Sequence, residues 1–433
     1  LSSADAVRGI YLSAGNNFIT ESGDINFDVR RRTSGPSDGI YVWTASPAGV
    51  GGRLLSASGS IQINDLTPAG SATGAQNSIN LARFATPTDS SHLFMGAASG
   101  TAVTSSTSNI TIQAQNINNP RNMFVNTAGN IVIEPVDSSF STAFANTPNF
   151  SGTPQSVRLG KSGNTANITI NSSISTAGPI AVHGGAITIN SDVSLTATNS
   201  RITLQGSSGQ TVGGSTSGAL TANELLLLGG NINLPNASNL IGTVAASGVG
   251  SLTYVDSNAL TIGTVGATSG IDASGNISVS TRTGDLTLGA GVTTTNSGAS
   301  ASILLNAGAS AAPGTATGGN LVISGSPALS VGSGGRISLM TGSLAGSTGL
   351  TSLSGLTAGT GRFRYNADES TNFASSWINP ISGFAGGAWT NLSSGVYGIY
   401  RELPTAITLD NINQVITYGC LLYTSPSPRD RTR

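Results

Sequence analysis

One short segment of the chain could carry a nucleophile. Residues Gly35–Gly39, GPSDG, match the Gly-x-Ser-x-Gly pattern of a nucleophile elbow, in which Ser37 would attack a carbonyl carbon. An elbow needs a strand before the serine, a helix after it and a histidine as general base. Pro-Ser-Asp-Gly is a turn sequence, and the IYVW that follows it is typical of a strand. We therefore interpret Ser37 as a turn residue.

The other reactive side chains are equally isolated. The two histidines, His92 and His183, have no second histidine or carboxylate at the spacing of a metal site. His183, in AVHGGA, is predicted in a turn, and His92 in a loop. The segment LGKSG resembles a phosphate-binding loop, but Gln155 stands where that motif needs glycine, so Lys161 is predicted in a turn. We predict no catalytic, cofactor-binding or metal-binding residue.

Charged residues make up only 9% of the 433 residues, and the net charge is -1. Nothing in this balance favours a nucleic-acid partner or an anionic membrane. The one basic run, Arg30–Arg32, is interpreted as a solvated loop, with a polyanion contact as the alternative. The acidic residues form no evident catalytic cluster; they include Asp24, Asp28, Asp38, Asp65, Asp137, Asp256, Asp272 and Asp285.

A five-residue phrase recurs along the chain: glycine, any residue, then apolar–polar–apolar. It appears twice within Ser274–Gly291, as GNISV and GDLTL. Further copies are GDINF, GSIQI, GNIVI, GAITI, GNINL, GNLVI and GRISL, with the variants SNITIQ, ANITIN and SRITLQ. Alternating apolar and polar residues predict a strand with one buried face, and the flanking Gly, Asn and Asp suit tight turns.

Successive phrases often begin 15 to 19 residues apart. A strand that returns at such an interval can bury its apolar face only against the next copy, so the chain is predicted to be all-β, a right-handed parallel β-helix. We expect about 18–20 residues per coil, about 18 coils and a rod of about 85 Å. The competing folds are an array of β-sandwich domains and a disordered Gly/Ser/Thr-rich linker. The aromatic content of 5% disfavours sandwiches, and the repeated β-branched alternation disfavours disorder.

The composition sets further limits. No apolar run approaches the roughly 18 residues of a membrane helix, so no membrane insertion is expected. Residues Cys420–Asp430, CLLYTSPSPRD, resemble a translated sequencing adapter. We therefore interpret 420–433 as not native, and Leu1 as lying inside a longer protein. Cys420 is the only cysteine, so disulfides and thiolate chemistry are not expected in the native segment.

The repetitive part resembles a known family. Residues Asn239–Leu288 are similar in texture and phrase to the filament of filamentous-haemagglutinin-type exoproteins, the large adhesins of two-partner secretion. The resemblance covers most of 1–345 and implies a β-solenoid filament there. It also implies export through an outer-membrane transporter of a Gram-negative bacterium and folding outside the cell. The secretion domain of that family, with its Asn-Pro-Asn-Gly-type motifs, is not found in this sequence.

The chain changes character beyond the filament. Residues 346–404 form an aromatic-rich segment with Phe363, Tyr365, Trp377, Trp389, Tyr397 and Tyr400, similar to a segment that follows the solenoid in these exoproteins. Residues 405–419, in AITLDNINQVITYG, resemble the opening strand pair of the bacterial Ig-like repeats called MBG domains.

The sequence therefore favours a non-enzymatic, secreted surface rod that mediates or displays adhesion to cells, glycans or abiotic surfaces. Two alternatives stay open. Parallel β-helices also host polysaccharide lyases and hydrolases, which gather carboxylates in a groove. The rod could instead be a passive stalk for a C-terminal toxin module.

Overall fold

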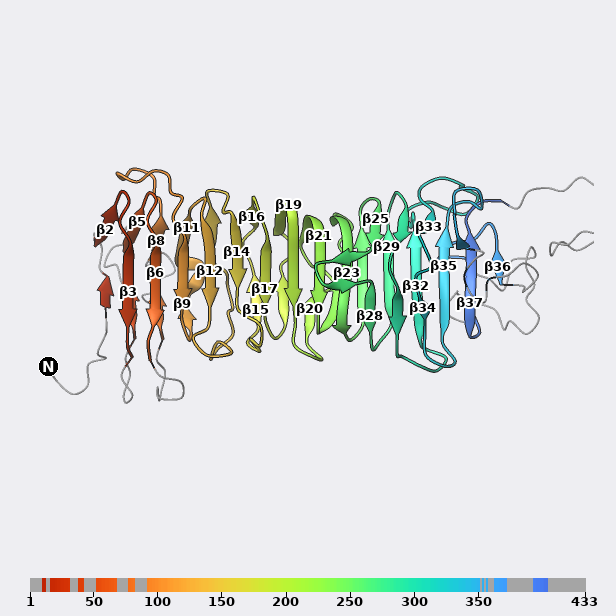
Figure 1. Cartoon of the computed structure of the whole chain (residues 1–433), viewed down its shortest axis with the longest axis horizontal. Coiled ribbons are helices and arrows are strands. Elements are labelled where there is room, and N and C mark those ends of the chain that lie inside the picture. Colours follow the sequence, from red (N-terminus) through yellow and green to blue (C-terminus); the bar gives the residue numbers. More distant parts are fainter. Residues whose placement is uncertain are drawn as a thin grey trace, which may run out of the picture.

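The computed structural model describes residues 10–12, 16–31, 38–42, 52–67, 77–81, 92–350, 353, 356, 362–371 and 392–403. Among these residues, almost every element is a short β-strand, and the helical element is a 3-10 turn, Pro120–Asn122. The strands stack into an elongated rod (Figure 1). The predicted fold class, an all-β parallel β-helix, is confirmed.

Successive strands of the chain lie on different sides of a coil. The first coil contains β1 (Ile10–Leu12), β2 (Asn17–Thr20) and β3 (Ile25–Val29). The second repeats this order with β4 (Ile40–Val42), β5 (Arg53–Ser56) and β6 (Ile61–Asp65), each paired parallel with its counterpart. This is the connectivity of a solenoid.

Four sheets run along the rod. The four-stranded sheet adds β7 (Ile79–Leu81) and β10 (Ile117–Asn118) to β1 and β4. The five-stranded sheet adds β8 (Leu93–Gly96), β11 (Met123–Asn126) and β13 (Asn149–Ser151) to β2 and β5.

The sixteen-stranded sheet begins with β3 and β6 and continues along the rod. Its main path adds β9 (Ile110–Gln113), β12 (Asn130–Glu134), β14 (Ser156–Leu159), β17 (Ile180–His183), β19 (Ser194–Gln205), β21 (Ala219–Leu228), β23 (Leu240–Val249), β25 (Leu260–Ile262), β30 (Leu286–Leu288) and β33 (Leu321–Ile323). Four strands join beside that path: β16 (Ile174–Thr176), β28 (Ile271–Ala273), β31 (Val292–Thr294) and β34 (Leu329–Ser330).

The ten-stranded sheet begins further along the chain. Its order is β15 (Ile168–Ile170), β18 (Ile187–Ile189), β20 (Thr211–Gly213), β22 (Asn231–Leu234), β24 (Leu252–Asp256), β29 (Ile277–Thr281), β32 (Ser302–Ala307), β35 (Arg336–Thr341), β37 (Gly395–Tyr400) and β36 (Phe363–Arg364). Within the described residues, antiparallel pairing is confined to the hairpin of β26 (Thr264–Val265) and β27 (Thr268–Ser269), so the sandwich alternative does not apply there.

One hydrophobic core follows the axis of the rod. Each strand points alternate residues inward, as in β18, where Ile187 and Ile189 are buried and Thr188 is exposed. The inward residues of neighbouring coils stack on one another, and a single cluster extends from Leu12 to Tyr400. This burial is the force that holds the coils together.

The structure explains each position of the recurring phrase. All twelve phrases found in the sequence form strands. The glycine lies against the backbone of the preceding coil, as Gly59 does against Gly23, where a side chain would overlap the carbonyl oxygen. The Asn or Asp that follows often reaches into the next coil: Asn109 Oδ1 accepts a hydrogen bond from the backbone N–H of Asn130 at 2.9 Å, 21 residues later.

The expected coil length was too short. Ile168 and Ile187 do lie in register on neighbouring coils, but Ile187 and Ile202 are on different sheets. Some of the 15- to 19-residue intervals between phrases therefore separate neighbouring coils, whereas others separate two sides of the same coil. GNISV and GDLTL likewise form β29 and β30, two sides of one coil. The main path of the largest sheet has twelve strands, so the expectation of about 18 coils is wrong.

The ten-stranded sheet continues past residue 345, the expected end of the filament. β37, from the aromatic-rich segment, pairs parallel with β35 over six residues, from Arg336–Gly395 to Thr341–Tyr400. Tyr400 stacks on Tyr365 with 5.1 Å between ring centroids. Arg401 is 1% exposed and donates to the carbonyl oxygens of Ala307 (2.6 Å) and Gly319 (2.7 Å). Trp377, Trp389 and the predicted segments 405–419 and 420–433 lie outside the described residues.

Candidate functional site

The segment that matched the nucleophile elbow is partly described. Ser37 lies outside the described residues, and β4 follows Asp38. The carboxylate of Asp38 accepts hydrogen bonds from the backbone and side chain of Asn77 (both 3.1 Å) and from the side chain of Asn80 (2.8 Å). Asp38 thus joins two coils, and the predicted strand after it is confirmed.

The two histidines lie far apart in the sequence and next to different sheets. His92 immediately precedes β8, in the predicted loop, and its ring meets Phe124 edge-on at 5.0 Å. Burial lowers the pKa of His92. His183 is not in a turn but ends β17, because its neighbour Val182 is an inward core residue that keeps the segment extended. Nδ1 of His183 lies 2.6 Å from Oε1 of Gln205.

Lys161 occupies the turn predicted for it. Gly160 and Gly163 have φ angles of 74° and 90°, and the backbone N–H of Asn164 bonds to the Lys161 carbonyl at 2.9 Å. The ammonium group donates to the carbonyl oxygen of Val136 at 3.0 Å. The Lys161 side chain therefore links its own coil to the preceding one.

The interpretation of Arg30–Arg32 as a solvated loop is wrong for Arg31. Its Nε lies 2.7 Å from Asp65 Oδ2, and the two side chains are 7% and 0% exposed. Asp65 also accepts from Ser78 Oγ at 2.5 Å and from the Thr67 backbone at 3.0 Å. A buried carboxylate needs such partners, and arginine supplies the compensating charge. No pattern in the sequence marked this pair.

The most reactive set of side chains forms a row on the outer face of the sixteen-stranded sheet. Glu134 Oε2 lies 2.8 Å from Arg158 Nη1, and Glu134 Oε1 accepts from Gln113 at 3.0 Å. His183 and Gln205 continue the row on the next coils. The pKa of His183 is lowered, first by burial and also by the charge of Arg158, while the bond to Gln205 opposes this. A neutral imidazole can accept a proton or a hydrogen bond.

The row borders a shallow hollow of about 150 Å³, lined by His183, Gly184, Gln205, Gly206, Ser207 and the turn 163–165. An acid, a cation and an imidazole thus lie on neighbouring coils, an arrangement that the scattered sequence positions did not reveal.

The aspartates seen as scattered in the sequence serve mostly as links between coils. Asp24 accepts from Ser60, Asp28 from Asn64 and Asp285 from the Asn320 backbone. The hydrogen bonds from Ser60 lower the pKa of Asp24. Among the described residues, no three His, Cys, Asp or Glu side chains gather closely enough to hold a metal ion.

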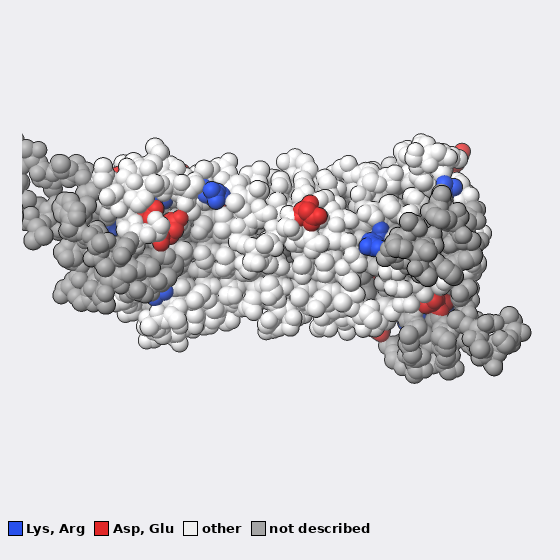
Figure 2. Space-filling view, turned by 180° about the vertical axis from the view of Figure 1, so that it is seen from behind, with Lys and Arg blue, Asp and Glu red and all other residues white. Residues whose placement is uncertain are grey.

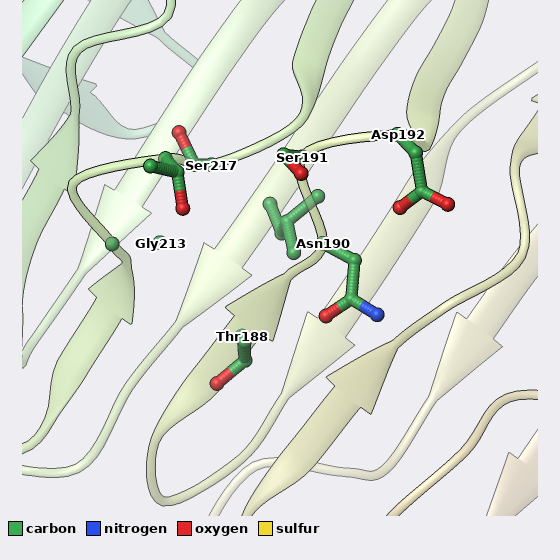
Figure 3. A pocket seen from close by; sticks show the side chains of 9 residues that line it. Thr188, Asn190, Ser191, Asp192, Gly213 and Ser217 are labelled. Atoms are coloured by element: carbon green, nitrogen blue, oxygen red, sulfur yellow. The ribbon is translucent and has the colours of Figure 1, made fainter.

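A second hollow of about 240 Å³ lies between β18 and β20 and the turns that follow them (Figure 3). Thr188 and Ile189 of β18 and the turn residues Asn190–Asp192 lie along one side. Gly213, Gly214, Thr216 and Ser217 belong to the next coil. Its lining combines polar side chains with Ile189 and two glycines, and it carries one carboxylate.

The outer surface is largely neutral. Figure 2 shows one face of the rod, on which a few acidic and basic groups stand apart in a surface of other residues. Outward positions are often Thr, Ser or Asn: Thr243, Thr261 and Thr287 form one column over three coils. Such columns offer hydroxyl and amide groups in a regular array about 4.8 Å apart.

No protein-family model matches the chain, and neither a curated protein nor a solved structure matches it. In the part of the chain that the structure describes, no helix is long and apolar enough to cross a membrane.

Proposed function

We propose that the protein is a non-enzymatic adhesive rod displayed on the outer surface of a Gram-negative bacterium. The observation that carries this proposal is the combination of an unbroken parallel stack with an outer surface of neutral hydrogen-bonding side chains. A stack of this kind holds a binding face away from its anchor, and a repeated face lets many weak contacts act together.

The proposal includes export through an outer-membrane transporter and contact with host cells, glycans or abiotic surfaces. Support for the route comes from the resemblance of residues Asn239–Leu288 to exported filaments and from the absence of cysteine before Cys420. A sequential stack suits export, because each coil can form on the preceding one as the chain emerges.

The full chain, coupled to beads at high density, tests the adhesive function. Coated beads should bind cultured epithelial cells, immobilised glycans or polystyrene several-fold better than albumin-coated beads, because multivalency amplifies weak contacts. Binding equal to albumin on all three surfaces would contradict adhesion and leave a passive stalk. Surface labelling of the native bacterium, with and without an adjacent transporter gene, tests location and route.

A second function, cleavage of polysaccharide, is favoured by one observation: Glu134, Arg158 and His183 lie together on one face. Glu134 and His183 could exchange protons with a glycan while Arg158 held an acidic group. Incubation of the full chain with uronic-acid polymers tests it. Chain shortening that is lost in Glu134→Gln would support cleavage, and unchanged polymer length would exclude it for those substrates.

A further inference from the structure

The hollow shown in Figure 3 is bordered by two glycines, and Gly214 is the one whose missing side chain leaves open space. Ile187 on β18 pairs with Val212 on β20, so Gly213 and Gly214 come where the preceding coil has Thr188 and Ile189. Gly214 has a φ of 154°, and a Cβ added to it would meet no atom within 4 Å. The missing side chain of Gly214 thus leaves open space near Ile189, whereas a Cβ on Gly213 would overlap the carbonyl oxygen of Asn233 on the following coil.

The hydrogen-bonding groups around this space are not used by the protein. Within the described chain, the side chains of Thr188, Asn190, Ser191, Asp192 and Thr216 make no hydrogen bond. Ser217 is only 3% exposed, and its hydroxyl has no partner. A buried hydroxyl without a partner costs free energy, so a polar group that bonded to Ser217 from the hollow would offset that cost.

The corresponding position one coil earlier shows the contrast. Ile170 pairs with Ile189, so Asn171 corresponds to Asn190. Asn171 Oδ1 accepts from the Thr147 backbone at 2.8 Å, and its Nδ2 donates to Asn146 at 2.8 Å. Asn171 is therefore a link between coils, whereas the amide of Asn190 remains available.

We propose that this hollow is a subsite for one neutral sugar unit of a glycan. The inference rests on the proposed adhesive function and names its ligand. Asp192 can accept from sugar hydroxyls, the amide of Asn190 can both donate and accept, and the hydroxyls of Thr188, Thr216 and Ser217 complete the set. The lone carboxylate disfavours acidic sugars. A volume of about 240 Å³ is below the roughly 300–1,000 Å³ of sites for drug-sized ligands and suits a single ring.

The test uses the full chain on an array of neutral oligosaccharides built from hexose and N-acetylhexosamine units, with sialylated and sulfated versions of the same chains. The best neutral ligand is then titrated by calorimetry against three variants. Asp192→Ala should weaken binding about tenfold or more, because a charged hydrogen-bond partner is lost. Ser217→Ala should weaken it several-fold while leaving the melting temperature unchanged or higher. Asp272→Ala, an exposed aspartate outside the hollow, should bind as the unmodified protein does.

Three results would overturn the subsite: equal binding by Asp192→Ala and the unmodified protein, a preference for sulfated or sialylated chains, or a lower melting temperature for Ser217→Ala. The bead assay separates this failure from failure of the proposed function. Beads that adhere while the array stays blank would overturn the sugar subsite alone, whereas beads that bind no surface would overturn adhesion itself.

Discussion

Gly129 lies directly against the backbone of Ser108 on the preceding coil. A Cβ on Gly129 would overlap the Ser108 carbonyl oxygen and stand 2.6 Å from the Ser108 carbonyl carbon. Gly129 is buried and its φ is ordinary, so the requirement for glycine here comes from the close approach of two coils and not from backbone conformation.

Gly129→Ala should therefore lower the free energy of unfolding by about 1–3 kcal/mol, the cost of forcing extra atoms into a packed interior. Urea denaturation followed by circular dichroism measures it. Gly289→Ala is the matched control, because its Cβ would lie 3.6 Å from the nearest atom in ordinary contact. That variant should be unchanged or about 0.4–1 kcal/mol more stable. Equal losses in both would contradict the steric explanation.

Asn239 is a buried link between two coils. Its Oδ1 accepts from the Leu220 backbone at 2.9 Å, and its Nδ2 donates to the carbonyl oxygens of Leu234 (3.2 Å) and Val255 (3.0 Å). Asn239→Ala should cost about 3 kcal/mol, because three buried backbone groups lose a partner. Asn233→Ala, on the outer face, should cost less than about 0.5 kcal/mol. Hydrogen exchange at Leu220 checks the first result, since its amide should exchange faster.

Loss of the buried ion pair between Arg31 and Asp65 should lower the free energy of unfolding much more than loss of an exposed ion pair. Asp65→Ala should destabilise the rod by about 3–5 kcal/mol, because the buried Arg31 would lose the carboxylate that its Nε contacts. Glu224→Ala breaks the ion pair between Arg201 and Glu224, whose side chains are 36% and 38% exposed. This variant should lose at most about 1 kcal/mol of stability. Thermal melts of both variants decide it; similar shifts would show that burial of the first pair is immaterial.

Asp256 and Tyr254 give the rod a defined response to pH. Both are buried, and Tyr254 donates to Asp256 Oδ2 at 2.7 Å. Burial raises the pKa of Asp256 above its usual 3.8, although the hydrogen bond from Tyr254 opposes this. A raised folded-state pKa means that the folded protein binds the proton more tightly. The contribution to stability is full below pH 3.8 and is lost as the pH rises through the folded-state pKa.

The measurement compares melting temperatures of the unmodified protein and Asp256→Asn from pH 3 to pH 7. Their difference should shift in favour of the unmodified protein on acidification. Tyr254→Phe removes the opposing hydrogen bond and should extend this shift to higher pH. A difference that does not vary with pH would mean that Asp256 keeps an ordinary pKa.

Arg401 should hold β37, which lies between β35 and β36 in the ten-stranded sheet, in place. Arg401→Ala removes its bonds to Ala307 and Gly319, and hydrogen exchange within β37 (Gly395–Tyr400) should accelerate at least tenfold while β18 is unaffected. Arg282→Ala, an exposed arginine, serves as the control. Unchanged protection of β37 would show that strand pairing alone fixes it.

The strands could be predicted from the sequence because alternation within each phrase determines which side chains are buried. Ile187 and Ile189 point inward and Thr188 outward, whatever the neighbouring coil contains. Coil length could not, because phrases such as GAITI and SRITLQ look alike on different sides of one coil. The partner of Arg31 lies 34 residues away with no local mark. The hollow beside Asp192 depends on Gly214 lying next to Ile189 of the preceding coil, and only the register of β18 and β20 reveals that placement.

The hydrogen bonds that join the coils run along the length of the rod, so a pull on its ends loads them directly. One coil near the middle spans 23 residues, from Arg201 to Glu224. Once released, that length of chain extends by roughly 75 Å at about 3.3 Å per residue. Under tension the rod would therefore lengthen in steps, each step being the release of one coil.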